Sequence, residues 1–148
     1  MNTLVIGIGD EHRRDYAVGL TAVRELRTLH TQGIDFAESH GEATALVDLW
    51  ADIPLAIIVT AGDTGETPGH IERIGPHDSA LTGRGSPIGD AMALARSLDR
   101  MPQRLLVFRI QIRDGSPGEG LSAQVRLAAG EVISEIADLL VTQRWVRH

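Results

Sequence analysis

The sequence contains no cysteine, few aromatic residues, no excess of basic side chains and no long hydrophobic run. Without cysteine the chain has no disulfide framework, no thiolate metal site and no cysteine nucleophile, and the cytoplasm is the expected compartment. Aromatic residues make up 3 % of the chain and the formal net charge is −6, so we expect no nucleic acid as a partner. The apolar run at residues 3–9 is too short for a secretory signal, and no run approaches the length of a membrane span, so we expect no membrane insertion.

What the sequence does have is a regular alternation of strand-like and helix-like segments. Its 148 residues, 43 % of them hydrophobic, match the commonest size of one globular domain, so we expect a single domain over residues 1–148. Apolar runs or alternating apolar residues predict strands at residues 3–9, 34–37, 54–60, 70–74 and 104–112. Helical spacing predicts helices at residues 16–29, 42–50, 88–98 and 121–140, the first capped by Asp15 and the last by Ser122. This order predicts an α/β fold, a three-layer sandwich in which helices cover both faces of a mainly parallel sheet of about five strands.

Acidic residues and histidines gather in the loops expected at one edge of this sheet. Ligands of parallel α/β sheets bind outside the carboxyl ends of the strands, which here lead into residues 9–15, 39–42, 61–70 and 111–120. Asp10, His12 and Asp15 lie on the first of these loops, and Asp63, Glu66 and His70 lie on the third. Mixed oxygen and imidazole donors suit a borderline divalent ion such as zinc or nickel. The alternative is that these are solvated acidic loops and that Asp15 serves only as a helix cap.

The glycines at the end of the first strand do not indicate a dinucleotide site. Gly7 and Gly9 match the start of that motif, but His12 stands where a third glycine is needed for close packing of helix and strand. Asp10 and Glu11 would also face the pyrophosphate with like charge. The two glycines are therefore interpreted as permitting a tight turn after the strand.

Several segments carry a more specific pattern, and they occur in a fixed order along nearly the whole chain. They are residues 4–10, Asp15 with Gly19, residues 57–61 followed by residues 63–65 and 68–69, residues 89–95 with Pro102, and residues 117–122 with Val125. Together they resemble the hydrogenase maturation proteases. The resemblance implies a phosphorylase/hydrolase-like α/β sandwich. It also implies an endopeptidase that removes a C-terminal extension from the large subunit of a nickel–iron hydrogenase after nickel insertion.

The resemblance further implies which side chains recognise the metal, and this chain departs from the family at each of them. In the family no cofactor is permanently bound, and a carboxylate, an Asp and a His contact the nickel of the substrate. The corresponding positions are occupied here by Tyr16, Thr60 and Arg84. A phenol and a threonine hydroxyl are poor ligands and a guanidinium repels a cation, so this metal-recognition site is expected to be lost. The loop after the second strand departs as well, because it reads Glu38-Ser-His-Gly-Glu-Ala43 in place of the family's glycine-rich Asp-Gly-Gly-Thr-x-Gly.

Two interpretations of this departure concern a hydrogenase. In the first, which is our expectation, the protein is a divergent endopeptidase whose catalytic groups are Asp10, His12 and Asp63. Its contacts to the substrate's nickel have then moved to Asp10, His12, Asp63 or His70, and its partner is a large-subunit precursor or a related protein. In the second, the protein is a non-catalytic binding or scaffold member that recognises a hydrogenase-like subunit or another partner through the same cleft.

The residues expected to line the cleft leave a third interpretation open. We expect substrate contacts from Asp15, Tyr16, His40, Gly41, Thr60 and Arg84. In the third interpretation, Arg84 and Arg13 bind a small anionic ligand through charge-assisted hydrogen bonds. The acid-rich loops on the same edge count against a ligand of negative charge.

Overall fold

A computed structural model describes residues 3–29, 33–75 and 87–146 of the chain. The strands are β1 (Thr3–Ile8), β2 (Ile34–Ser39), β3 (Leu55–Gly62), β4 (Ile71–Ile74) and β5 (Arg104–Gln111). The helices are a 3-10 turn η1 (Arg14–Ala17), then α1 (Val18–Leu29), α2 (Ala43–Trp50), α3 (Pro87–Leu98) and α4 (Ala123–Val146). None of the helices in these ranges has an apolar stretch of the length that crosses a bilayer.

The strands form one sheet with the order β2-β1-β3-β5-β4 in the described part of the chain. Strands β2, β1, β3 and β5 run parallel to their neighbours, and only β4 pairs antiparallel with β5, at the edge of the sheet. The predicted mainly parallel sheet is therefore confirmed, as is the short edge strand near residues 70–74.

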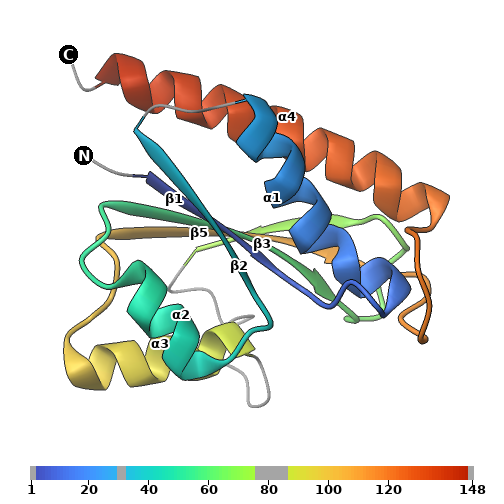
Figure 1. Ribbon diagram of the computed structural model, residues 1–148, viewed down its shortest axis with the longest axis horizontal. Helices are drawn as coiled ribbons and strands as arrows, with labels where there is room; N and C mark the ends of the chain where they lie inside the picture. Colours follow the sequence, from blue (N-terminus) through green and yellow to red (C-terminus); the bar gives the residue numbers. More distant parts are fainter. Residues whose placement is uncertain (1–2, 30–32, 76–86, 147–148) are drawn as a thin grey trace.

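The helices form two layers around this sheet, as Figure 1 shows, with α1 and α4 on one face and α2 and α3 on the other. Successive side chains of a strand point to opposite faces, so each central strand supplies both layers. In β3, Ile57 and Val59 pack toward α1 and α4, whereas Ala56 and Ile58 pack toward α2 and α3. This two-sided burial explains why the strands read as continuous apolar runs.

The chain order reverses between β1 and β3, because β1 leads through α1 to β2 on one side and α2 then returns the chain to β3 on the other. A crevice forms at such a switch point, outside the carboxyl ends of the two strands. Glycines let the start of α1 approach this point closely. A Cβ on Gly7 would collide with the carbonyl oxygen of Gly19, and a Cβ on Gly19 would collide with the carbonyl oxygens of Ile8 and Val59.

Candidate functional site

A pocket of about 520 Å³ lies at this switch point, and we call it the edge pocket. It is lined by Ile8, Gly9, Asp10, Tyr16, His40, Thr60, Ala61, Gly62 and Pro87. These residues come from the ends of β1 and β3, from η1, from the loop after β2 and from the start of α3. The structure thus brings together four of the residues singled out in the sequence, which are Asp10, Tyr16, His40 and Thr60.

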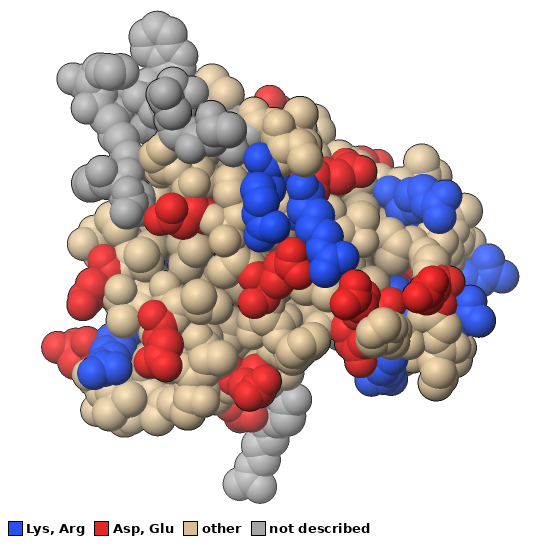
Figure 2. Space-filling model, in the orientation of Figure 1, with Lys and Arg blue, Asp and Glu red and all other residues tan. Residues whose placement is uncertain are grey.

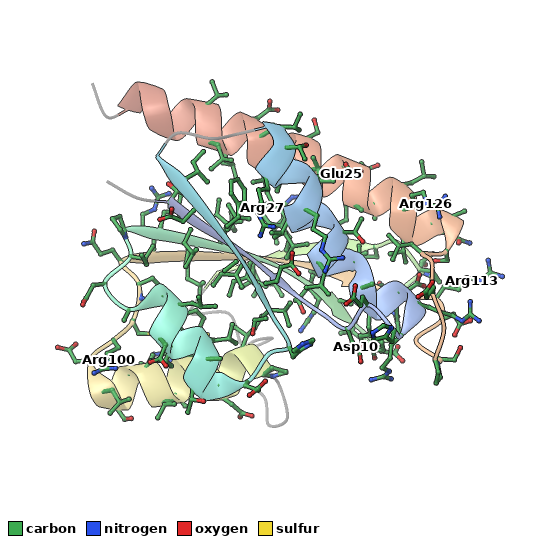
Figure 3. All side chains as sticks on the ribbon, in the orientation of Figure 1. Asp10, Glu25, Arg27, Arg100, Arg113 and Arg126 are labelled. Atoms are coloured by element: carbon green, nitrogen blue, oxygen red, sulfur yellow. The ribbon has the colours of Figure 1, made fainter. Side chains whose placement is uncertain are left out.

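Asp10 is held by the fold of its own loop. Its Oδ1 accepts a hydrogen bond of 2.9 Å from the backbone N–H of His12, and its backbone N–H donates to the carbonyl oxygen of Tyr16 at 3.1 Å. Aspartate commonly closes a turn in this way, with its carboxylate bonded to the backbone two residues on. Figure 3 labels Asp10 just beyond β1, on the same side of the molecule as Arg113 of the loop after β5. The half-buried carboxylate therefore has a fixed place at the wall of the edge pocket.

His40 is oriented by a backbone carbonyl. Its Nδ1 lies 3.1 Å from the carbonyl oxygen of Gly9. A carbonyl oxygen can only accept, so Nδ1 carries the hydrogen, and in the neutral ring Nε2 keeps a free electron pair. The adjacent Gly41 is buried and has φ +96°, and a Cβ there would lie 3.3 Å from side-chain atoms of both Ile8 and Pro87. Gly41 therefore lets the loop after β2 pass close to the pocket wall and hold His40 at its mouth.

Tyr16 and Thr60 contribute hydroxyl groups rather than charges. The Tyr16 ring packs so close to Gly115 that a Cβ there would collide with it, and the guanidinium of Arg13 lies over the ring, 4.5 Å from its centroid. A cation over an aromatic face is attracted to the ring, so both contacts help to fix its position. Thr60 Oγ1 makes a long contact of 3.4 Å with the carbonyl oxygen of Ala61. Both positions thus offer neutral hydrogen-bonding groups to the pocket.

The other sequence-predicted donors lie away from the edge pocket. Asp63 is exposed and its Oδ1 accepts a 3.1 Å hydrogen bond from Nε2 of the buried Gln111. His12 and His70 are exposed on the loops after β1 and β3. Within the described ranges no three Asp, Glu or His side chains are placed so that they could hold a metal ion together.

The shared metal centre expected from Asp10, His12, Asp63 and His70 is therefore not formed by this geometry. The physical reason is that Asp10 is folded back onto its own loop, whereas Gln111 holds the loop after β3 against β5. The separate catalytic roles of His12 and Asp63 stay predictions. Arg84 lies outside the described residues, so its expected role also stays a prediction.

Asp15 has a role that the sequence did not reveal. Its side chain is fully buried, and its Oδ2 accepts hydrogen bonds from the backbone N–H groups of Arg113 and Asp114 at 2.9 and 3.0 Å. The backbone N–H of Ser122 donates to Oδ1 at 2.7 Å, and the Ser122 hydroxyl donates to Oδ2 at 2.9 Å. Burial alone would raise the pKa of Asp15, but these hydrogen bonds from Ser122, Asp114 and Arg113 together hold it below its ordinary value.

The predicted helix cap at Asp15 is thus wrong, because both carboxylate oxygens accept hydrogen bonds from residues 113, 114 and 122, far along the chain. Among the residues that the structure describes, no side chain caps the start of η1, where Arg14 has the left-handed φ of +45°. Asp15 instead ties the loop after β5 and the start of α4 to η1, which carries Tyr16 into the edge pocket. Ser122 does precede α4, and its carbonyl accepts from the Arg126 N–H, but its hydroxyl serves Asp15.

Glu38, the acidic residue at the end of β2, is engaged in ion pairs. Arg24 donates to it with Nη2 at 2.8 Å and with Nε at 3.0 Å, and Arg27 Nη1 lies 3.6 Å away. The hydrogen bonds from Arg24 hold the pKa of Glu38 below its ordinary value. Figure 2 shows that acidic and basic side chains also alternate in small groups over the face in view. The negative charge of Glu38 is thereby balanced by Arg24 and Arg27, and Glu38 is not among the residues that line the edge pocket.

The sheet order, the two helical layers and the crevice at the switch point define an α/β protein with the fold of the hydrogenase maturation proteases. No family model and no curated protein sequence matches the chain.

The solved structures with this fold include two that carry the name HybD. The hydrogenase maturating endopeptidase HybD from E. coli superposes with a TM-score of 0.86 at 18 % identity, covering 97 % of this chain and 94 % of that one. The NiFe hydrogenase maturation protease HybD from Thermococcus kodakarensis gives a TM-score of 0.73 at 21 % identity, covering 95 % and 99 %. The maturation protease HycI from T. kodakarensis KOD1 gives 0.72 at 18 % identity, covering 94 % and 92 %. The resemblance inferred from ordered sequence segments is confirmed at the level of the fold.

Proposed function

We propose that this protein is a divergent hydrogenase-maturation-type endopeptidase, which processes the C-terminus of the large subunit of a nickel–iron hydrogenase. The observation that carries the proposal is the match, over more than nine tenths of both chains, to structures that are named as hydrogenase maturation endopeptidases or proteases. The edge pocket supports it, because it lies where ligands of such sheets bind. We place the activity in the cytoplasm, the compartment expected of a chain without cysteine.

The edge pocket has the size and lining that a peptide end requires. Its volume of about 520 Å³ lies within the range of clefts that hold small ligands, about 300–1,000 Å³. Ile8, Ala61 and Pro87 provide an apolar floor for aliphatic parts of a chain, while Asp10 and His40 bring electron-pair donors. The pocket can therefore accept an extended peptide segment and a polar group at one point along it.

The pocket residues suit hydrolysis of a peptide bond. A carboxylate or an imidazole can take a proton from an attacking water, which assigns this step to Asp10 or His40. The hydroxyls of Tyr16 and Thr60 can donate hydrogen bonds to the carbonyl oxygen as negative charge develops on it. Asp63 and His12, which the sequence predicts as further catalytic groups, lie on neighbouring loops. Nickel enters this scheme as part of the substrate.

A processing assay tests the proposal directly. The purified full-length protein is incubated with a large-subunit precursor, either loaded with nickel or nickel-free, and the precursor mass is followed by mass spectrometry. We expect a shortened product from the nickel-loaded precursor and none with an Asp10→Ala/His40→Ala double variant. A stable complex in which the precursor keeps its full length over a long incubation would refute the endopeptidase activity and favour the binding or scaffold role.

A further inference from the structure

One arginine stands beside the edge pocket without a role in the scheme above. Arg109 lies on β5, where its Cα is paired with that of Thr60 on β3 and with that of Glu72 on β4. Paired residues of neighbouring strands point their side chains to the same face of a sheet. Thr60 follows Ile58 onto the face that α2 and α3 cover (Figure 1). Arg109 is therefore the direct neighbour, on the same face, of a residue that lines the pocket.

The stem of Arg109 packs against a second lining residue, Gly62. A Cβ on Gly62 would lie 2.6 Å from Cδ, 2.9 Å from Cγ and 3.3 Å from Nε of Arg109, so the absence of a side chain at Gly62 makes room for this stem. The Arg109 side chain is only 16 % exposed although it is charged. This packing keeps the guanidinium beside the pocket wall, on the other side of β3 from Asp10 and His40, which follow β1 and β2.

Glu72 engages only one of the five N–H groups of this guanidinium. Nε of Arg109 donates to Oε1 of Glu72 at 2.9 Å. In the ion pair of Arg73 with Glu135, by contrast, both Nε and Nη2 donate. Within the described part of the chain, neither Nη atom of Arg109 has a hydrogen-bond partner, and neither is among the buried atoms that lack one. Both Nη groups are therefore accessible to a ligand.

The chemistry of this guanidinium selects a carboxylate as its ligand. A planar fork of N–H groups matches the two oxygens of a carboxylate or of a phosphate. Arg109 already shares its charge with Glu72, and Asp10 lines the same pocket, so a group with one negative charge is repelled less than a phosphate group with about two. The stem of Arg109 is already fixed against Gly62, so binding orders little more of the side chain.

We propose that Arg109 forms a carboxylate subsite at the β5 side of the edge pocket, where its Nη1 and Nη2 groups bind the two oxygens of a ligand's carboxylate. Glu72 positions the guanidinium through Nε. Asp10 and His40 then face the other end of the same ligand. That this ligand is the peptide substrate rests on the proposed function. The carboxylate belongs either to an acidic side chain of the peptide or to a free C-terminus, and the experiment distinguishes these two sources.

Short peptides test the subsite without any cleavage. Isotope-labelled full-length protein is titrated at constant ionic strength with acetylated alanine tripeptides, and NMR follows the Arg109 Nε–H signal and the Thr60 and Gly62 amides. One peptide has a free C-terminal carboxylate, a second has an amidated C-terminus, and a third is amidated but carries a central glutamate. We expect these signals to shift with one or both of the carboxylate peptides and to stay unchanged with the peptide that lacks a carboxylate. The peptide that binds identifies the source of the carboxylate.

Matched variants assign the binding to this guanidinium. Arg109→Gln should weaken peptide binding at least about tenfold, or about 1.4 kcal/mol, because a charge-assisted pair of hydrogen bonds is lost. Arg109→Lys keeps the charge beside Glu72 and so preserves the fold, but it lacks the planar fork and should weaken binding about threefold or more. Arg73→Gln is the control, because Arg73 is paired with Phe108 in the sheet and so lies on the face of α1 and α4; it should bind the peptides as the wild type does.

Three results would overturn the proposal. They are wild-type binding in both Arg109 variants, equal shifts with the peptide that lacks a carboxylate, and tighter binding of inorganic phosphate than of the carboxylate peptides at the same signals.

The precursor assay then separates this inference from the proposed function. If the wild type shortens the precursor but neither carboxylate peptide shifts the Arg109, Thr60 and Gly62 signals, the inference is wrong and the proposed function stands. If the peptides bind through Arg109 as expected while the precursor keeps its full length, the proposed function is wrong and the carboxylate subsite stands.

Discussion

Replacing Asp15 by asparagine, which has nearly the same shape, should strongly lower the free energy of unfolding. Asp15→Asn keeps the volume but exchanges one acceptor oxygen for an NH₂ group. With the amide oxygen at the Oδ2 position, Arg113, Asp114 and the Ser122 hydroxyl keep an acceptor, whereas the Ser122 N–H faces another donor. In the opposite orientation the Ser122 N–H keeps its acceptor and the Ser122 hydroxyl can turn to accept from the NH₂ group, but the N–H groups of Arg113 and Asp114 both face a donor. The variant therefore loses at least one buried hydrogen bond and the charge that strengthens the rest.

The cost follows from the number of bonds affected. A hydrogen bond to a charged group contributes about 1.5–3 kcal/mol and a neutral one about 1 kcal/mol, so one lost and three weakened bonds remove about 3–5 kcal/mol. That is a large part of the roughly 5–15 kcal/mol by which a domain is typically stable. With a urea dependence of about 1–3 kcal/mol per molar, we expect the unfolding midpoint to fall by at least about 1 M.

Urea unfolding followed by circular dichroism measures this change, with Asp35→Asn as the matched control. Asp35 is exposed on β2, where a substitution of this kind changes stability by no more than about 0.5 kcal/mol. The structural reasoning would be refuted if the two variants unfolded at the same urea concentration.

The same pair of variants gives a pH signature. The folded-state pKa of Asp15 lies below the ordinary value of 3.8, so the unfolded chain binds the proton more readily. The stability from Asp15 is therefore complete above the unfolded-state pKa and is lost as the pH falls through the folded-state value. We expect the wild type to lose more stability than Asp15→Asn between about pH 5 and pH 3. Equal acid dependence in both proteins would contradict the depressed pKa.

Three further predictions test the edge pocket and its supports. Gly41→Ala should lower the free energy of unfolding by about 1–2 kcal/mol, measured by thermal unfolding, because the φ of +96° at Gly41 disfavours a Cβ. It should also slow precursor cleavage. Wild-type values for both would contradict the role given to the loop after β2. Tyr16→Phe keeps the ring and its contacts with Gly115 and Arg13, so stability should stay within about 0.5 kcal/mol while cleavage falls about tenfold. An undiminished cleavage rate would exclude the hydroxyl from the reaction. Gln111→Leu removes the buried acceptor of the Thr64 N–H and Oγ1, so it should lower the free energy of unfolding by about 1–3 kcal/mol. It should also speed hydrogen exchange at the Thr64 amide. Unchanged protection of that amide would show that Gln111 does not hold the loop after β3.

The ends of the helices and strands were predicted from the sequence less accurately than their presence. The first helix was predicted from residue 16, but α1 begins at Val18 after the 3-10 turn, because the Asp15 carboxylate is engaged elsewhere and gives no cap. The strand predicted to end at Ala37 continues to Ser39, and the last helix continues to Val146. The extension of β2 follows from its pairing with β1 as far as Ser39, which a local pattern does not contain.

The candidate site was predictable in part. Asp10 and His40 were singled out because they follow strands whose carboxyl ends meet at one edge of the sheet, whereas Tyr16 and Thr60 were singled out through the family resemblance. Which of the edge residues share a pocket was not predictable. Asp63 and His70 follow the same strand as Thr60, yet they lie on a loop that Gln111 holds against β5.

The sequence by itself determined the layers of this protein. Continuous apolar runs indicate strands that are buried on both faces, and helical spacing indicates helices that are buried on one. The hydrophobic effect favours burial of apolar surface whichever apolar residues it packs against, so these patterns predict the layers without the partners. The tertiary structure alone decided the partners of the polar groups. The donors to Asp15 lie 98 to 107 residues away, and His40 finds its acceptor 31 residues earlier. A hydrogen bond requires two specific atoms about 3 Å apart, and such proximity exists only once the sheet has set its strand order.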